Sequence, residues 1–339
     1  MEQLVVNKED LKYNIEKLKS YANNNANGEY TFIGVVKGNG YGMDLIQYSK
    51  SLVENDINYL AVATLKEALI LAENKVCDNI LLMSVLNKTE EIELAVKYGI
   101  IVTIDSMQNA KIVNELSKKG YNIRVHVKID TGFGRYGFVY NDLANIVNTI
   151  KSMQANKINV EGIFSHLSDA YRRNNKHTIE QFELFKNVLK VLKDNDIDIK
   201  LKHICNSPAF LNYPEMHLNS ARIGSALVGR ICAEKDIGLR KIGQFEIEIA
   251  EVKQVPKGFS ISYLNSYKTK RETKIAIIPI GYLDGYQVTQ KVDMFRTVDK
   301  LRRTVRDIKS LFKKQKITVK INGRIYDIIG TIRNVSYNC

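Results

Sequence analysis

Short apolar runs alternate with amphipathic stretches over roughly the first 230 residues of the chain. The runs are rich in β-branched residues and occupy 31–36, 59–63, 79–85, 100–105, 122–130, 159–166, 199–206 and 220–224. Apolar residues recur at helical spacing in 9–21, 65–73, 89–98, 108–119, 141–153 and 178–194. Asn7 is the expected N-cap of the first of these helices. Strands alternating with helices indicate a parallel sheet, and eight strands over this length predict a closed (β/α)8 barrel of the TIM type.

The pattern changes after residue 240. Strands are expected at 245–255, 261–263, 274–279 and 317–321, without regular helices between them. We therefore predict an α/β barrel over residues 1–235 and a smaller β-rich C-terminal domain over 236–339. A basic segment near 293–313 interrupts the second domain, with apolar residues at helical spacing and arginines among them. It is either a solvated surface helix or a helix that borders a site and attracts carboxylates.

Composition narrows the class of protein. The chain has 339 residues, 45% hydrophobic and 26% charged, as in an ordinary globular protein. The net charge of +13 is spread along the chain with acidic residues interleaved, so we expect no nucleic-acid partner. No apolar run approaches the ~20 residues of a membrane span, and the N-terminus lacks the pattern of a signal peptide. The four cysteines are scattered without metal-ligand spacing, so we expect no metal site and a reduced, cytoplasmic setting.

Polar side chains follow the predicted barrel strands, where the active sites of such barrels lie. Those residues are Lys37, Lys128, Asp130, His166, Asn206, Ser207, Arg222 and Gly224. Lys37 comes directly after an apolar run, and partial burial would lower the pKa of its amine and make it nucleophilic. The alternative for Lys37 alone is a strand-end lysine whose amine extends to water.

Seven separated motifs carry a resemblance to a known family. They are VVKGNGYG (35–42), HVKIDTGFGRYGF (126–138), GIFSHLSDA (162–170), CNSPAF (205–210), ARIGSALVG (221–229), ISYLNSY (261–267) and IPIGYLDG (278–285). Their content and order resemble those of alanine racemases over about residues 5–285. The resemblance implies a barrel followed by a β domain, in a homodimer with composite active sites, acting on a small amino acid.

The resemblance also implies roles for individual residues. Lys37 would bind pyridoxal 5'-phosphate as a Schiff base and act as one catalytic base, and Tyr263 of the partner subunit would be the opposite base. Arg222 would face the pyridine nitrogen of the cofactor, and Arg135 would lie near its phenolic oxygen. The remaining candidates for the cofactor and active-site shell are Tyr41, Asn206, Ser207, Gly224, Ser225 and Tyr282. Lys128 would be the lysine that is carbamylated in many members, and His166 would hydrogen-bond Tyr263 or Arg222.

Some positions depart from the family pattern. Met43 and Leu264 stand where many relatives have histidine and glycine. Thr331, Arg333 and Asn334 replace residues that limit the substrate pocket, and a further pocket tyrosine is missing, so the chain is a fragment or closes its pocket differently. We expect a racemase for alanine, with serine or a larger amino acid as alternatives. A cofactor-binding protein without racemase activity and a decarboxylase are the competing functions, and Arg222 disfavours the decarboxylase.

Overall fold

A computed structural model describes residues 2–25, 28–171, 173–286, 317–329 and 337–338. They form two compact units, one from the described residues of 6–244 and one from residues 2–5 with the described residues after 244. The boundary expected between 235 and 236 stays a prediction. The basic segment near 293–313 and the substituted positions Thr331, Arg333 and Asn334 lie outside the described residues.

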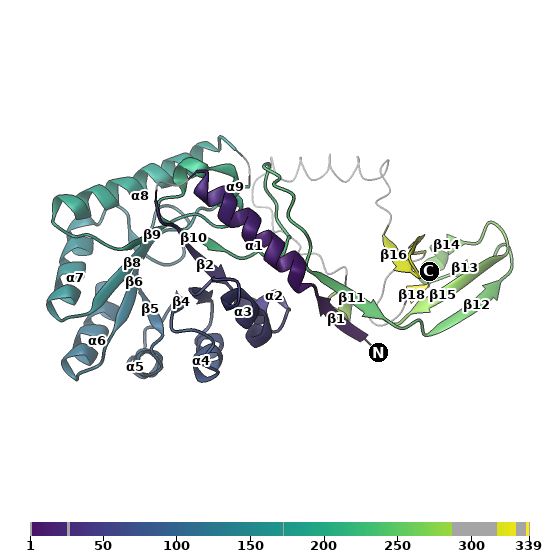
Figure 1. Cartoon of the computed structure of the whole chain (residues 1–339), viewed down its shortest axis with the longest axis horizontal. Coiled ribbons are helices and arrows are strands. Elements are labelled where there is room, and N and C mark those ends of the chain that lie inside the picture. The colour runs from purple at the N-terminus through teal and green to yellow at the C-terminus, as the bar shows by residue number, and fades with distance from the viewer. Residues whose placement is uncertain (1, 26–27, 172, 287–316, 330–336, 339) are drawn as a thin grey trace. The chain divides into compact units, whose positions relative to one another are not determined.

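The first unit is a closed barrel of parallel strands within the described residues (Figure 1). Its strands are β2 (Thr31–Val35), β3 (Leu60–Val62), β4 (Ile80–Val85), β5 (Ile101–Ile104), β6 (Arg124–Asp130), β8 (Asn159–Phe164), β9 (Leu201–His203) and β10 (Ser220–Ile223). Each pairs with the next in parallel, and the pairing of β10 with β2 closes the ring. A short strand, β7 (Phe138–Val139), adds to β6. The predicted (β/α)8 barrel is confirmed.

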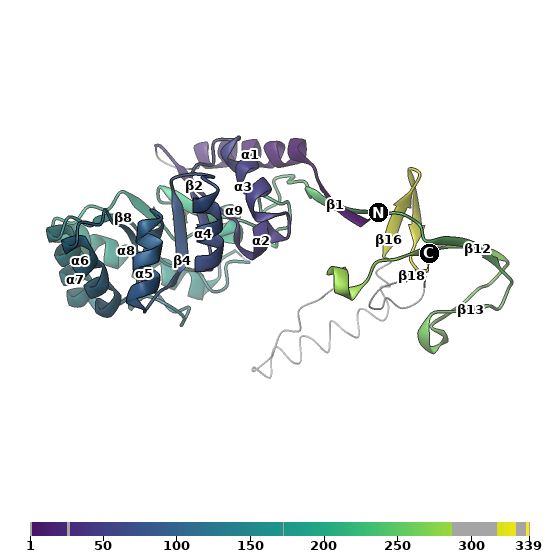
Figure 2. The same cartoon turned by 90° about the horizontal axis from the view of Figure 1, so that it is seen from below.

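Helices surround the strands of the barrel (Figures 1 and 2). They are α1 (Lys8–Asn23), α2 (Lys37–Tyr41), α3 (Leu45–Val53), α4 (Leu65–Glu73), α5 (Thr89–Lys97), α6 (Met107–Lys118), α7 (Leu143–Ala155), α8 (Lys176–Asp194) and α9 (Ser207–Asn212), with the 3-10 turn η1 (Pro214–Met216). Asn7 caps α1 as expected, since its side chain accepts a hydrogen bond from the N–H of Asp10 at 3.0 Å. The sequence pattern missed α3 and the turns α2 and α9.

Apolar side chains fill the barrel from several strands at once. Ile33 and Val35 of β2, Ala61 of β3, Leu81 of β4 and Ile101 of β5 belong to one buried cluster. Strands of a parallel barrel are covered on both faces, by this interior and by the outer helices, so they read as continuous apolar runs. That is why the runs were recognisable in the sequence. The same geometry brings the carboxyl ends of all the strands to one rim.

The second unit is β-rich. Its strands are β1 (Glu2–Val6), β11 (Gly243–Ile247), β12 (Glu251–Val255), β13 (Ser260–Ile261), β14 (Tyr267–Lys268), β15 (Thr273–Ile278), β16 (Thr318–Ile321), β17 (Arg324–Asp327) and β18 (Tyr337–Asn338). Strand β15 pairs antiparallel with β12 and β18. The buried side chains of Val255, Ile261 and Ile275 form one small hydrophobic core of this unit. The strand expected at 261–263 was wrong at its end, because Tyr263 begins the 3-10 turn η2 (Tyr263–Asn265).

In the described part of the chain, no helix is both long enough and apolar enough to cross a membrane.

Candidate active site at the carboxyl ends of the barrel strands

A cavity of about 580 Å³ opens among the carboxyl ends of the barrel strands. Ten residues singled out from the sequence line it, namely Lys37, Tyr41, Lys128, Arg135, His166, Asn206, Ser207, Arg222, Gly224 and Ser225. They come from loops or strands far apart in the chain, so the barrel itself brings them together. Among the remaining candidates, Asp130 does not line the cavity, and Tyr263 and Tyr282 belong to the C-terminal unit.

Lys37 is exposed in this chain, so the partial burial expected from the preceding apolar run is wrong, and it leads into a left-handed turn. The φ angles of Gly38, Asn39, Gly40 and Tyr41 are 65°, 53°, 65° and 57°, a conformation that glycine adopts without a steric penalty. Oε1 of Glu67, on α4, accepts hydrogen bonds from the N–H groups of Gly38 at 2.6 Å and Asn39 at 3.2 Å. Burial alone would raise the pKa of Glu67, but these and other backbone hydrogen bonds outweigh it and lower the pKa. A carboxylate from the next helix thus fixes the turn that follows Lys37.

Glu67 also caps its own helix. Its Oε2 accepts hydrogen bonds from the N–H groups of Ala63 at 3.3 Å and Thr64 at 3.2 Å, and Thr64 Oγ1 receives the N–H of Glu67 in return. The result is a capping box at the start of α4. The side chain of Glu67 therefore connects the backbone after β3 with the turn after β2, and it holds the turn that follows Lys37 in place at the end of the barrel.

Neutral hydrogen-bonding groups gather around Gly224. Ser207 Oγ accepts hydrogen bonds from the N–H groups of Gly224 at 3.0 Å and Ala226 at 3.3 Å. The hydroxyl of Tyr41 packs so closely on Gly224 that a side-chain carbon there would overlap it. Burial raises the pKa of Tyr41 to about 12, so its hydroxyl stays protonated and can donate a hydrogen bond. Hydroxyls and a close backbone of this kind suit an oxyanion such as a phosphate.

Arg222 is 4% exposed and is held by several acceptors. Its Nη1 donates to His203 Nδ1 at 2.7 Å, and its Nη2 donates to Ser165 O at 2.7 Å and to His166 Nδ1 at 3.1 Å. Burial lowers the pKa of Arg222 to about 10, which leaves the guanidinium charged at neutral pH. Burial, followed by the charge of Arg222, lowers the pKa of His166 well below its ordinary value, so His166 is a neutral acceptor.

The loop after β6 places Arg135. Both carboxylate oxygens of Asp130 accept backbone hydrogen bonds, from Gly132 and Phe133 at 2.9 Å and from Gly134 and Arg135 at 2.9 and 3.2 Å. The guanidinium of Arg135 then lies over the ring of Phe133, 4.4 Å from its centre. Asp130, which the sequence placed at a strand end, therefore shapes this loop from within.

Lys128 lies deep in the barrel, 4% exposed. Its Nζ donates to the carbonyl of Ile129 at 3.2 Å and lies 4.9 Å from the centre of the Phe164 ring. Burial first, and the charge of Arg222 second, lower the pKa of Lys128 well below its ordinary value. Lys37, Lys128, Arg135, Arg222 and Arg230 line the cavity together, and no aspartate or glutamate is among its described lining residues. The cavity is suited to an anionic ligand.

The sequence reasoning missed several lining residues, among them Tyr136, Tyr171, Arg230 and Cys232. Tyr136 is the neighbour of Arg135 within the motif GFGRYG, so its place in the motif was a usable signal. Arg230 and Cys232 directly follow ARIGSALVG, beyond the end of the last barrel strand. Tyr171 directly follows the motif GIFSHLSDA, so its place beside that motif was a usable signal as well.

The C-terminal unit presents its two candidate tyrosines on exposed turns. Tyr263 is 67% exposed and begins η2, while Tyr282 begins the 3-10 turn η3 (Tyr282–Asp284). Ser262 and Leu264, on either side of Tyr263, have φ angles of 67° and 58°. Leu264 is the position where related sequences were expected to carry glycine, and its left-handed backbone is the physical reason for that preference.

Comparisons with known proteins agree with the geometry. Residues 6–231 match the family model described as alanine racemase, N-terminal domain, and residues 242–333 match alanine racemase, C-terminal domain. The alanine racemase of Methanococcus maripaludis is 35% identical over 282 residues, covering 81% of this chain and 74% of the relative. The solved alanine racemase of Clostridium difficile 630 superposes with a TM-score of 0.81 at 28% identity, covering 99% of this chain and 82% of that one.

A third comparison concerns a structure described with a covalently bound cofactor. The alanine racemase of Bartonella henselae with covalently bound pyridoxal phosphate has a TM-score of 0.77 to this chain at 21% identity. The match covers 99% of this chain and 85% of that one. At this identity the likeness shows a shared fold.

Proposed function

This chain is a member of the alanine racemase family, and from that membership we propose that it interconverts L- and D-alanine with pyridoxal 5'-phosphate, using Lys37 and Tyr263 as its two bases. The observation that carries the proposal is the convergence of Lys37, Tyr41 and Arg222 with seven other expected residues on one cationic cavity. Serine or a larger amino acid remains the alternative substrate to be tested beside alanine.

The residues present fit pyridoxal phosphate. The hydroxyls of Ser207 and Tyr41, on either side of Gly224, offer neutral donors for the phosphate, and Ser225 and Asn206 line the same cavity. Lys37 supplies the amine for the covalent link, and Arg135 the cation for the phenolic oxygen. When bound, the cofactor supplies an electron sink for the carbanion formed at the substrate Cα.

Arg222 determines how strong that sink is. In our proposal its guanidinium donates a hydrogen bond to the pyridine nitrogen, and with a pKa of about 10 it does not give up a proton there at neutral pH. A ring nitrogen that Arg222 leaves unprotonated would be a weaker electron sink, which would favour return of a proton to Cα over transamination. A decarboxylase of this architecture keeps the ring nitrogen protonated with a carboxylate, and none is found among the described residues that line the cavity.

Two bases account for the exchange of configuration. Lys37 takes or returns the proton on one face of the substrate Cα, and Tyr263 does so on the other. Each positioned proton transfer contributes about 10²–10⁴-fold to the rate. We further propose that the protein works as a homodimer in which each copy supplies Tyr263 to the other. Cys77, Cys205 and Cys232 are free thiols, which is compatible with the reduced, cytoplasmic setting that we propose.

The test is an assay of chirality with added cofactor. Purified protein is incubated with L-alanine, D-alanine and L-serine, and both enantiomers of each product are measured. We expect racemisation of alanine in both directions, and its absence for every substrate would contradict the proposal.

Single-turnover deuterium exchange then tests the two bases. We expect Tyr263→Phe to slow α-proton exchange strongly in one enantiomer, while the other retains its first proton transfer to Lys37. Equal losses for both enantiomers would refute this assignment. The conservative Tyr267→Phe, at a tyrosine of the same unit that packs beside a core, is the matched control.

A further inference from the structure

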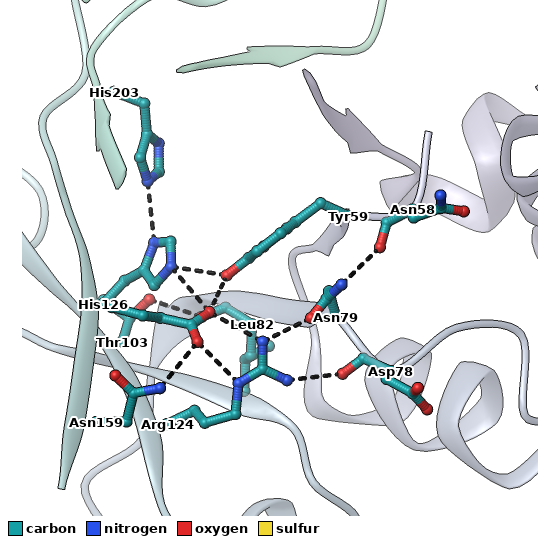
Figure 3. Close-up of polar contacts among 11 residues, drawn as sticks. Asn58, Tyr59, Asp78, Asn79, Leu82, Thr103, Arg124, His126, Asn159 and His203 are labelled. Carbon is teal, nitrogen blue, oxygen red and sulfur yellow. Dashed lines mark hydrogen bonds and ion pairs between the residues drawn. The ribbon is translucent and has the colours of Figure 1, made fainter. Parts of the chain in front are cut away.

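A continuous line of hydrogen bonds runs from Arg222 through the interior of the barrel. Figure 3 shows its part from His203 through His126 to Tyr59. Arg222 Nη1 lies 2.7 Å from His203 Nδ1, and His203 Nε2 lies 2.9 Å from His126 Nδ1. His126 Nε2 lies 2.7 Å from Tyr59 Oη, which in turn lies 2.5 Å from Glu161 Oε1. These side chains come from β10, β9, β6, the residue before β3, and β8. We call this line the interior relay.

The protons of the relay have one consistent arrangement. Tyr59 has a single hydroxyl proton and donates it to the carboxylate of Glu161, so Tyr59 Oη must accept from His126 Nε2. Burial raises the pKa of Glu161, but its contacts with His126, Arg124 and Tyr59 outweigh burial and lower the pKa to about 2, which keeps Glu161 a carboxylate. The charge of Glu161 therefore fixes two directions: Tyr59 donates to Glu161, and His126 donates to Tyr59.

The direction of these bonds also determines which ring nitrogen of His126 and of His203 carries the proton. Burial lowers the pKa of His126 and of His203, and each is neutral with one N–H. With its proton on Nε2, His126 accepts at Nδ1, so His203 must donate from its own Nε2. His203 Nδ1 is then a free lone pair that faces Arg222 Nη1. Every donor in the relay points from the cation at one end toward the carboxylate at the other.

The relay compensates a buried charge that has no carboxylate partner among the described residues. No carboxylate forms an ion pair with Arg222 among the described residues, although Arg222 is 4% exposed. An unpaired buried cation is costly unless polar groups face it. The aligned dipoles of the relay present their negative ends to Arg222 and terminate on the charge of Glu161. Arg124 holds that charge in place with bonds of 2.8 and 3.1 Å.

We propose that Glu161 is a positioning residue of this racemase, which fixes His126 and His203 as Nε2–H tautomers so that His203 accepts from Arg222 and holds its guanidinium toward the cavity. The role of Arg222 at the cofactor rests on the function proposed above, whereas the tautomers follow from this chain alone. Reversal of the relay would put an N–H of His203 against an N–H of Arg222, two donors facing each other.

Glu161→Gln tests the direction of the relay. The amide of the introduced glutamine can donate to Tyr59, which lets Tyr59 donate to His126 and the relay reverse. Tyr59→Phe is the companion variant, because the carboxylate of Glu161 lies 3.6 Å from His126 Nε2 and its negative charge still favours the proton on that nitrogen. Glu73→Gln, an exposed carboxylate on α4, is the control for loss of one negative charge.

The readout is nitrogen NMR of histidine-labelled protein without cofactor, in which the imidazole nitrogens report which one carries the proton. The chain has 5 histidines, and their signals are assigned by substituting them one at a time. We expect Nε2–H forms for His126 and His203 in the unchanged protein, in Tyr59→Phe and in Glu73→Gln, and loss of that pattern in Glu161→Gln. An Nδ1–H or doubly protonated form of either histidine in the unchanged protein overturns the proposal. Retention of the pattern in Glu161→Gln also overturns it.

A second readout uses the holoenzyme. If Arg222 is held less firmly, the ring nitrogen is less well shielded from protonation and transamination becomes more frequent. We expect Glu161→Gln to raise the ratio of pyruvate formed to alanine racemised about tenfold, the size of one lost hydrogen bond to a charged group. An unchanged ratio with altered tautomers overturns the positioning role. If the protein racemises nothing, the proposed function fails while the NMR result still decides the relay.

Discussion

Replacement of Glu67 by glutamine tests whether the turn that follows Lys37 is held from α4. Glutamine keeps the size of the side chain but has one accepting oxygen in place of two. Its NH₂ group must face either the N–H groups of Gly38 and Asn39 or those of Ala63 and Thr64, and one pair loses its acceptor. Hydrogen bonds to a charged group contribute about 1.5–3 kcal/mol each. Because Glu67 is partly exposed and solvent weakens these bonds, we expect the turn to lose about 1–2 kcal/mol of stabilisation.

Glu91→Gln is the matched control. Glu91 occupies the same third position of the neighbouring helix α5, so its replacement removes the same interaction with the helix dipole. Its carboxylate pairs with Lys88 at 3.6 Å, a surface contact that is worth little. We expect its cost to stay below about 0.5 kcal/mol.

Hydrogen–deuterium exchange over the segment 37–42 measures the effect where it arises. We expect exchange there to become about tenfold faster in Glu67→Gln, since 1.4 kcal/mol corresponds to a factor of ten. Because the folded-state pKa of Glu67 is lowered from 4.5, its contribution is complete above pH 4.5 and disappears as the pH falls through the lowered value. Equal exchange in the Glu67 and Glu91 variants at pH 7 would refute the reasoning.

Two further predictions concern the cavity. Gly224→Ala adds a methyl that overlaps the Tyr41 hydroxyl. We therefore expect about tenfold weaker binding of pyridoxal phosphate, measured by an absorbance titration. An unchanged dissociation constant would count against the phosphate site proposed beside Gly224. Lys128→Met, in carbonate-free buffer, should be more stable to urea at pH 7 by about 1–3 kcal/mol. The folded-state pKa of Lys128 lies below 10.5, so this gain should shrink as the pH rises toward 10.5, and a gain independent of pH would contradict it.

Much of the barrel could be predicted from sequence because its strands are covered on both faces and appear as apolar runs. The site residues could be predicted as a group, since the carboxyl ends of barrel strands meet at one rim. The bounds of the strands were predicted less accurately. A strand was expected at 199–206, and the structure has one only at Leu201–His203. There the backbone leaves the sheet early so that Asn206 can cap the short helix α9.

Contacts between distant residues escaped the sequence analysis for a physical reason. Glu67 reads as an ordinary acid in the first turn of a helix, and its bonds to Gly38 cross 29 positions of the chain. His126 and His203 stand in apolar strands, and only the closure of the barrel brings their rings together across 77 positions. The pattern of a strand reports which residues are buried, but not which buried polar groups will meet.

Lys37 as the residue that holds the cofactor is the central claim, and one measurement tests it directly. The protein is loaded with pyridoxal phosphate, reduced with borohydride, digested and sequenced by mass spectrometry. Lys128 is the competing amine, because it lines the same cavity and burial lowers its pKa. We predict that the reduced adduct lies on Lys37 and is lost in Lys37→Ala. An adduct on Lys128, or one that persists in Lys37→Ala, would contradict the account.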